Sequence, residues 1–115
     1  MGRYLSLDMG AESGRLVIVD IGASEIVTEV VYRFETPVVH DALGRRCWDF
    51  PTIVVEVIHG LSLASSHGPF QSLGIDTWGL DFGLLDSNQK LVSLPVSHRD
   101  HRTDGYLAKA ADVVG

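Results

Sequence analysis

The sequence predicts an α/β protein with a mixed sheet: an antiparallel meander of three strands, a crossover helix and a returning strand. Two observations support this fold class. Apolar and β-branched residues fill segments near 4–8, 14–20 and 26–34, which turn residues separate. Apolar residues then recur every three or four positions within 51–65, before a short apolar run near 72–76. A strand, a helix and a further strand in this order favour a βαβ unit.

Composition limits the range of functions. The chain has 115 residues, enough for at most one small domain, and 45% of them are hydrophobic, which can supply a core. The net charge of −6 argues against a nucleic-acid partner, because phosphate binding needs a basic surface. Cys47 is the only cysteine, so an internal disulfide and a cysteine zinc site are excluded, and a reducing cytoplasm is expected. No apolar run reaches the length of a membrane span.

The middle of the chain supplies the crossover. We expect 35–43 to be a connection and 44–48 to be a brief extended segment. Pro51 suits the first turn of a helix, and the apolar positions that follow predict an amphipathic helix, although several of them are β-branched. The helix is expected to end near Gly68 and Pro69, because glycine followed by proline is a common stop.

The last third is expected to be mostly extended. The continuous apolar run Leu73 to Ile75 predicts a strand buried on both faces. The run 80–85 predicts another strand, which is closed by a turn at 86–89. Residues 90–97 are expected to be extended, and 106–114 can begin a helix.

The first candidate site is the segment from Asp8 to Arg15. Gly10 and Gly14 allow a tight turn and a close ligand, and backbone N–H groups in such a turn can bind an anion. Ser13 adds a hydroxyl, and Asp8 can hold Mg²⁺ through a water molecule. The segment matches neither the Walker loop nor the dinucleotide fingerprint, and an ordinary turn remains the alternative.

The second candidate follows the predicted strand Leu73 to Ile75. Asp76 and Trp78 lie just past its carboxyl end, where open α/β sheets bind ligands. Trp78 can pack against the apolar face of a sugar, and Gly79 leaves room for it. Asp81 follows closely and can line the same pocket. The alternatives are a hairpin with polar corners and a Trp78 that belongs to the core.

The third candidate is the charged segment 97–104. Its simplest interpretation is a solvated loop with salt bridges. A metal site is a further alternative, although the spacing of the potential ligands matches no standard pattern. Those potential ligands are His98, Asp100, His101 and Asp104.

Several of these segments also carry a resemblance to a known family. The runs LDMGAESGR, GIDTWGLDFGLLD and LPVSHRDHRTDG, with Arg33-Phe34 and Trp48-Asp49 between them, resemble the N-terminal part of the FGGY carbohydrate kinases. Within that family the chain is most similar to the enzymes that phosphorylate L-rhamnulose. The resemblance begins near Tyr4 and reaches the last residue. It implies an actin-like, ribonuclease H-like fold, with ATP as co-substrate and Mg²⁺ as cofactor.

The resemblance also implies roles for particular residues. It gives Ala11, Ser13, Gly14 and Arg15 contacts to the ATP phosphates, and it places the sugar near Gly79. The predicted phosphate site comprises Asp8, Gly10, Ala11, Ser13, Gly14 and Arg15, with Asp8 also the predicted metal ligand, through a water molecule. The predicted sugar site comprises Asp76, Trp78, Gly79, Asp81, Arg99 and Asp100. Glu12 departs from the family pattern, which has a small polar residue there, and its carboxylate would repel a phosphate.

One component of a sugar kinase is not assigned. A general base must accept the proton of the attacking hydroxyl, and no residue of this chain can be given that role. In the family, that base and the adenine site lie much further along a chain of roughly four times this length, folded as two domains. We therefore expect residues 1–115 to be a partial N-terminal FGGY carbohydrate kinase domain, inactive alone and prone to self-association through an uncovered sheet face. The alternative is a non-catalytic remnant that binds sugar or phosphate.

Overall fold

The computed structural model describes residues 1–115, which form two compact units. The sheet unit contains residues 1–37 and 50–79, and the hairpin unit contains residues 38–49 and 80–115. None of the helices is both long enough and apolar enough to pass through a membrane.

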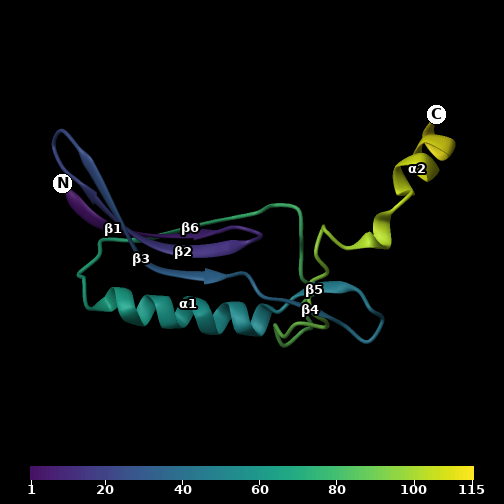
Figure 1. Cartoon of the computed structure of the whole chain (residues 1–115), viewed down its shortest axis with the longest axis horizontal. Helices are drawn as coiled ribbons and strands as arrows, with labels where there is room; N and C mark the ends of the chain where they lie inside the picture. The colour runs from purple at the N-terminus through teal and green to yellow at the C-terminus, as the bar shows by residue number, and fades with distance from the viewer. The chain divides into compact units, whose positions relative to one another are not determined.

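The sheet unit has the predicted mixed sheet. Its strands are β1 (Gly2–Met9), β2 (Ser13–Ile21), β3 (Ile26–Glu35) and β6 (Leu73–Thr77), in the order β3-β2-β1-β6 (Figure 1). β1, β2 and β3 form an antiparallel meander, whereas β6 pairs with β1 in parallel. The meander and the returning strand are therefore confirmed.

Helix α1 (Phe50–Ser65) makes the crossover and lies along one face of the sheet (Figure 1). The core between them consists of alternate residues of β1 and β2 together with one helix residue: Leu5, Leu7, Leu16, Ile18 and Ala64. A period of two on the strands and of about 3.6 on the helix brings these side chains to one interface. Gly60 is buried in the helix. A Cβ atom at this position would lie 2.7 Å from the Tyr32 ring, so the contact requires glycine.

The prediction that 73–75 is buried on both faces is wrong. All five residues of β6 are exposed, and Ile75 keeps 65% of its surface accessible. β6 is an edge strand, and α1 packs against β3 and β2. The apolar run therefore indicates a strand correctly, but no element of this chain covers it.

The hairpin unit has little regular structure. Its strands are β4 (Val38–His40) and β5 (Arg46–Trp48), followed by the 3-10 helix η1 (His101–Thr103) and helix α2 (Tyr106–Val114). The predicted extended segment at 44–48 and the predicted helix at 106–114 are confirmed. The prediction of a plain connection at 35–43 is wrong, because β4 lies within it and pairs with β5.

The predicted strand at 80–85 is also wrong. Its only sheet-like pairing is an isolated bridge between Leu85 and Leu91. Phe82 and Leu84 remain 68% and 60% exposed, so the apolar run contributes little to a core. The 90–97 segment forms two isolated bridges, from Leu91 to Leu85 and from Val96 to Cys47, and Pro95 lacks the N–H group that a longer ladder requires.

Candidate functional site

The turn between β1 and β2 carries the first predicted site and is fixed to the end of β3. The Gly10 N–H donates to the Ser13 carbonyl at 3.0 Å. The Thr36 hydroxyl donates to the Gly10 carbonyl at 2.7 Å, and the Thr36 N–H donates to the Glu12 carbonyl at 2.9 Å. These hydrogen bonds close the turn and connect its backbone to Thr36, the residue that follows β3.

Gly14 has a packing role in addition to the role predicted for it. A Cβ atom at this position would lie 2.3 Å from the Phe34 ring, which is closer than real contacts allow. Neither Gly10 nor Gly14 has a positive φ. The sequence therefore needs glycine at position 14 for the β2–β3 contact, whether or not a ligand approaches it.

Charged side chains surround this turn. Arg15 forms an ion pair with Asp8, its partner across the β1–β2 register. Arg33 is the register partner of Arg15 on β3, and its guanidinium donates to the Ser13 hydroxyl at 3.3 Å. Arg33 is not among the residues predicted for this site. Its antiparallel register with Arg15 is the signal that could have identified it.

The parallel pairing of β1 and β6 brings two of the predicted sites together. Asp8 and Asp76 are register partners, as are Met9 and Thr77. Register partners on adjacent strands point to the same face, so these carboxylates are neighbours at the carboxyl ends of both strands. Trp78 follows and is only half-buried, which does not fit the alternative of a core residue. A side chain at Gly79 would meet nothing within 4 Å.

Asp81 is in the hairpin unit and has two partners there. Its Oδ2 atom accepts a hydrogen bond from the Trp48 indole Nε1 at 2.6 Å and lies 2.9 Å from Nδ1 of His98. The Asp81 side chain is 8% exposed, and Trp48 is 2% exposed. Asp81 is among the residues predicted for the sugar site, whereas no role is predicted for Trp48.

Asp100 acts as a cap in the same unit. Its two oxygens accept from the backbone N–H groups of Arg46 at 2.7 Å and Arg102 at 2.9 Å, and it is the N-cap of η1. These two backbone hydrogen bonds lower the pKa of Asp100. Arg99 is exposed, and its N–H donates to the Ser97 hydroxyl at 3.1 Å.

The metal alternative for residues 98–104 finds no support. His98 contacts Asp81, Asp100 caps η1, and His101 lies 3.1 Å from Asp104. His98 and Asp100 therefore have partners outside this set, His101 and Asp104 contact each other, and no three His, Cys, Asp or Glu side chains converge on a metal position.

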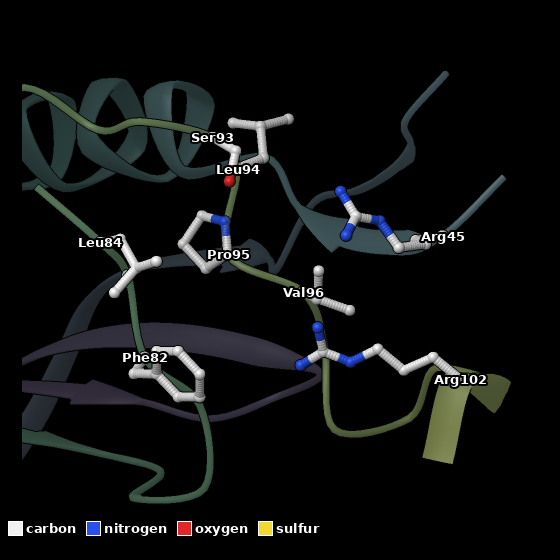
Figure 2. A pocket seen from close by; sticks show the side chains of 9 residues that line it. Arg45, Phe82, Leu84, Ser93, Leu94, Pro95, Val96 and Arg102 are labelled. Carbon is white, nitrogen blue, oxygen red and sulfur yellow. The ribbon is translucent and has the colours of Figure 1, made fainter. Parts of the chain in front are cut away.

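A cavity of about 230 Å³ also lies in the hairpin unit. Figure 2 shows its apolar wall, which includes Phe82, Leu84 and Pro95, and two arginines, Arg45 and Arg102, that reach toward it. Arg45 is engaged by Asp41 through an ion pair of 2.6 Å. None of the residues predicted to bind phosphate or sugar lines this cavity.

Comparison with known proteins bears on these sites. No protein-family model matches the chain. The rhamnulokinase of Mannheimia succiniciproducens is 37% identical over 113 residues, which cover 96% of this chain and 23% of that protein. The rhamnulokinase of Oceanobacillus iheyensis is 40% identical over 105 residues, or 90% of this chain and 22% of that protein. The chain therefore spans less than a quarter of the length of the curated relatives it matches.

Solved structures show the same fold. The ligand-bound xylulose kinase of Lactobacillus acidophilus matches 98% of this chain and 23% of its own, with a TM-score of 0.77 and 15% identity. A xylulose kinase from Rhodospirillum rubrum matches with a TM-score of 0.75 and 17% identity. Both similarities support the predicted actin-like, ribonuclease H-like fold. Sequence and fold together confirm the predicted resemblance: the chain is similar in sequence to rhamnulokinases and in fold to sugar kinases of the FGGY type, over their N-terminal region.

Proposed function

We propose that this chain supplies the phosphate-binding turn and part of the sugar site of a carbohydrate kinase. The reaction is transfer of the γ-phosphate of ATP to a hydroxyl of a ketose. One observation carries the proposal: the parallel register of β1 and β6 makes Asp8 and Asp76 neighbours. The turn after β1 and the segment after β6 therefore leave the sheet at the same end, where open α/β sheets bind ligands.

The phosphate side of the site has matching electrostatics. Arg15, itself a predicted phosphate contact, and its register partner Arg33 add positive charge beside the turn. Mg²⁺ fits the neighbouring carboxylates of Asp8 and Asp76, because it prefers oxygen ligands. Asp8 would hold the ion through water, and the ion would neutralise charge on the transferred phosphate.

For the sugar, we propose L-rhamnulose. The relatives named rhamnulokinase, at 37% and 40% identity, support this choice. The proposed sugar-binding residues of the sheet unit are Asp76, Trp78 and Gly79. Those of the hairpin unit are Asp81, Arg99 and Asp100. The place of action would be the cytoplasm.

Two arginines of the β1–β2 hairpin allow a matched test. Arg15 pairs with Asp8 at the turn end, and Arg3 pairs with Asp20 at the opposite end, at 2.7 Å. We expect MgATP to shift the amide NMR signals of residues 10–14 in the unmodified chain and in Arg3→Ala. In Arg15→Ala the affinity for MgATP should fall at least tenfold, since a charged hydrogen bond contributes about 1.5–3 kcal/mol. Equal effects of the two variants would refute the phosphate site.

A non-catalytic module is the second candidate, because no residue here can be assigned as the general base. We expect the isolated chain to show no ATP-dependent phosphorylation of L-rhamnulose in a coupled assay with MgATP. Turnover above background that Asp8→Ala abolishes would show that the chain contains a complete site.

A further inference from the structure

Asp81, Trp48 and His98 form a cluster, here called the Asp81 cluster. The pairing of two segments of the hairpin unit holds it in place. The backbone N–H of Trp48 donates to the Pro95 carbonyl, and the backbone N–H of Ser97 donates to the Arg46 carbonyl, each at 2.9 Å. β5 and residues 95–97 therefore run side by side. Trp48 and His98 extend from their ends, with ring centroids 6.1 Å apart. Both rings have a nitrogen within hydrogen-bond distance of Oδ2 of Asp81.

The chemistry of Asp81 fixes the proton on His98. An ionised carboxylate only accepts hydrogen bonds, and the Trp48 indole nitrogen only donates. Nδ1 of His98, at 2.9 Å from the Asp81 carboxylate, must then carry a proton. In the neutral ring this leaves Nε2 as an acceptor, and Nε2 has no hydrogen-bond partner in the structure. The His98 side chain is 26% exposed, so part of the ring is open to a ligand.

We propose that His98 is a specificity-determining sugar-binding residue, whose Nε2 accepts a hydrogen bond from a sugar hydroxyl. Asp81 is then a positioning residue, which fixes the orientation and tautomer of His98 together with Trp48. This inference rests on the proposed kinase function and deepens it. It assigns a role to His98, and it makes the contribution of Asp81 indirect, since Oδ2 of Asp81 is already shared by two rings.

The tautomer can be measured without a ligand. Long-range ¹H–¹⁵N NMR of the full chain at neutral pH should show Nδ1 of His98 protonated and Nε2 unprotonated. Asp81→Ala should shift the ring toward the Nε2–H form, whereas Asp81→Asn should keep much of the original form, because the amide oxygen still accepts. Dispersed backbone amide signals from β1 and β2, which lie in the other unit, and from β5 confirm that each variant is folded. A wild-type ring with a proton on Nε2 alone would overturn the inference.

Titration with L-rhamnulose tests the sugar contact. We expect the Nε2 signal of His98 to move, and His98→Ala and Asp81→Ala each to weaken binding about 3- to 10-fold, the range for one hydrogen bond. The double variant should be no weaker than His98→Ala alone, because Asp81 acts through His98. His101→Ala is the matched control, since His101 lies near Asp104 with 92% of its side chain exposed.

The outcomes separate the two proposals. Additive losses in the double variant would overturn the positioning role of Asp81. Sugar binding that His98→Ala leaves unchanged would overturn the contact while the proposed function stands. A chain with the expected tautomer that binds no L-rhamnulose would overturn both the sugar contact and the sugar part of the proposed function.

Discussion

The two units of this chain are stabilised by different interactions. In the sheet unit, fully buried Leu16 and Ile18 pack against α1. In the hairpin unit, aspartates are the organising side chains, and each accepts or shares at least two hydrogen bonds. These are Asp41, Asp81, Asp86 and Asp100. Apolar packing produces a periodic pattern in the sequence, whereas hydrogen bonding by single carboxylates does not.

Truncation of an apolar side chain should lower the unfolding free energy strongly in the sheet unit and little in the hairpin unit, and this is the largest effect that we expect. Leu16→Ala in the sheet unit is expected to cost about 2–5 kcal/mol of unfolding free energy, because it leaves a cavity in a fully buried position. Leu84→Ala in the hairpin unit, where the side chain is 60% exposed, should stay within about 0.5 kcal/mol. Urea unfolding followed by far-UV CD measures both. Equal losses would remove the proposed difference between the units.

The same difference explains how much of the fold could be predicted. Alternation on β1 and β2 and the helical period of 51–65 are local patterns that burial imposes, so the meander, the crossover and the returning strand were predictable. β4 has only three residues, too few to show a period. The hydrogen bond from the Arg46 N–H to Asp100 joins residues 54 positions apart, and no local pattern encodes it.

The candidate site divides in a similar way. The turn residues were found because glycine, serine and aspartate cluster within 8–15. The neighbourhood of Asp8 and Asp76 follows from strand register, which needs the fold. Arg33 and Trp48 were missed as site residues because their relevant contacts, to Ser13 and Asp81, depend on the tertiary structure.

Acid should loosen the hairpin unit through its aspartates. Backbone N–H groups of Arg46 and Arg102 lower the pKa of Asp100 below its ordinary 3.8. Burial alone would raise the pKa of Asp41, but hydrogen bonds from Arg45 and Leu43 outweigh burial and lower it. A carboxyl with a lowered native pKa stabilises the fold above its ordinary pKa, and that contribution is lost as the pH falls through the native value. Protection of the Arg46 and Arg102 amides from hydrogen exchange should therefore decline below about pH 4.

Asp100→Asn tests the cause of this decline. The amide cannot ionise and has one acceptor oxygen where Asp100 uses two, so the variant should lose part of the protection of the Arg46 and Arg102 amides at neutral pH and respond less to acid. Asp104→Asn is the control, because its side chain is 73% exposed. If Asp100→Asn kept the full acid dependence, another group would be responsible.

Self-association should respond to surface changes that scarcely alter folding. Val30 on β3 is the partner of Val17, on the face of the sheet opposite to the Leu16–Tyr32 pair, and it is 53% exposed. Apolar area removed from water is worth about 25 cal/mol per Å², so a patch of a few hundred Å² on this face would favour association. The net charge of −6 opposes it only weakly at physiological salt. We expect oligomers in sedimentation velocity, and a shift of Val30→Lys toward monomer with a change in folding free energy within about 0.5 kcal/mol. Ile58→Lys, on α1 and 60% exposed, is the matched control for another apolar surface of the sheet unit. A sharp monomer boundary for the unmodified chain would show that the 115 residues need no further cover, and a shift caused by Ile58→Lys alone would move the interface from the sheet to the helix.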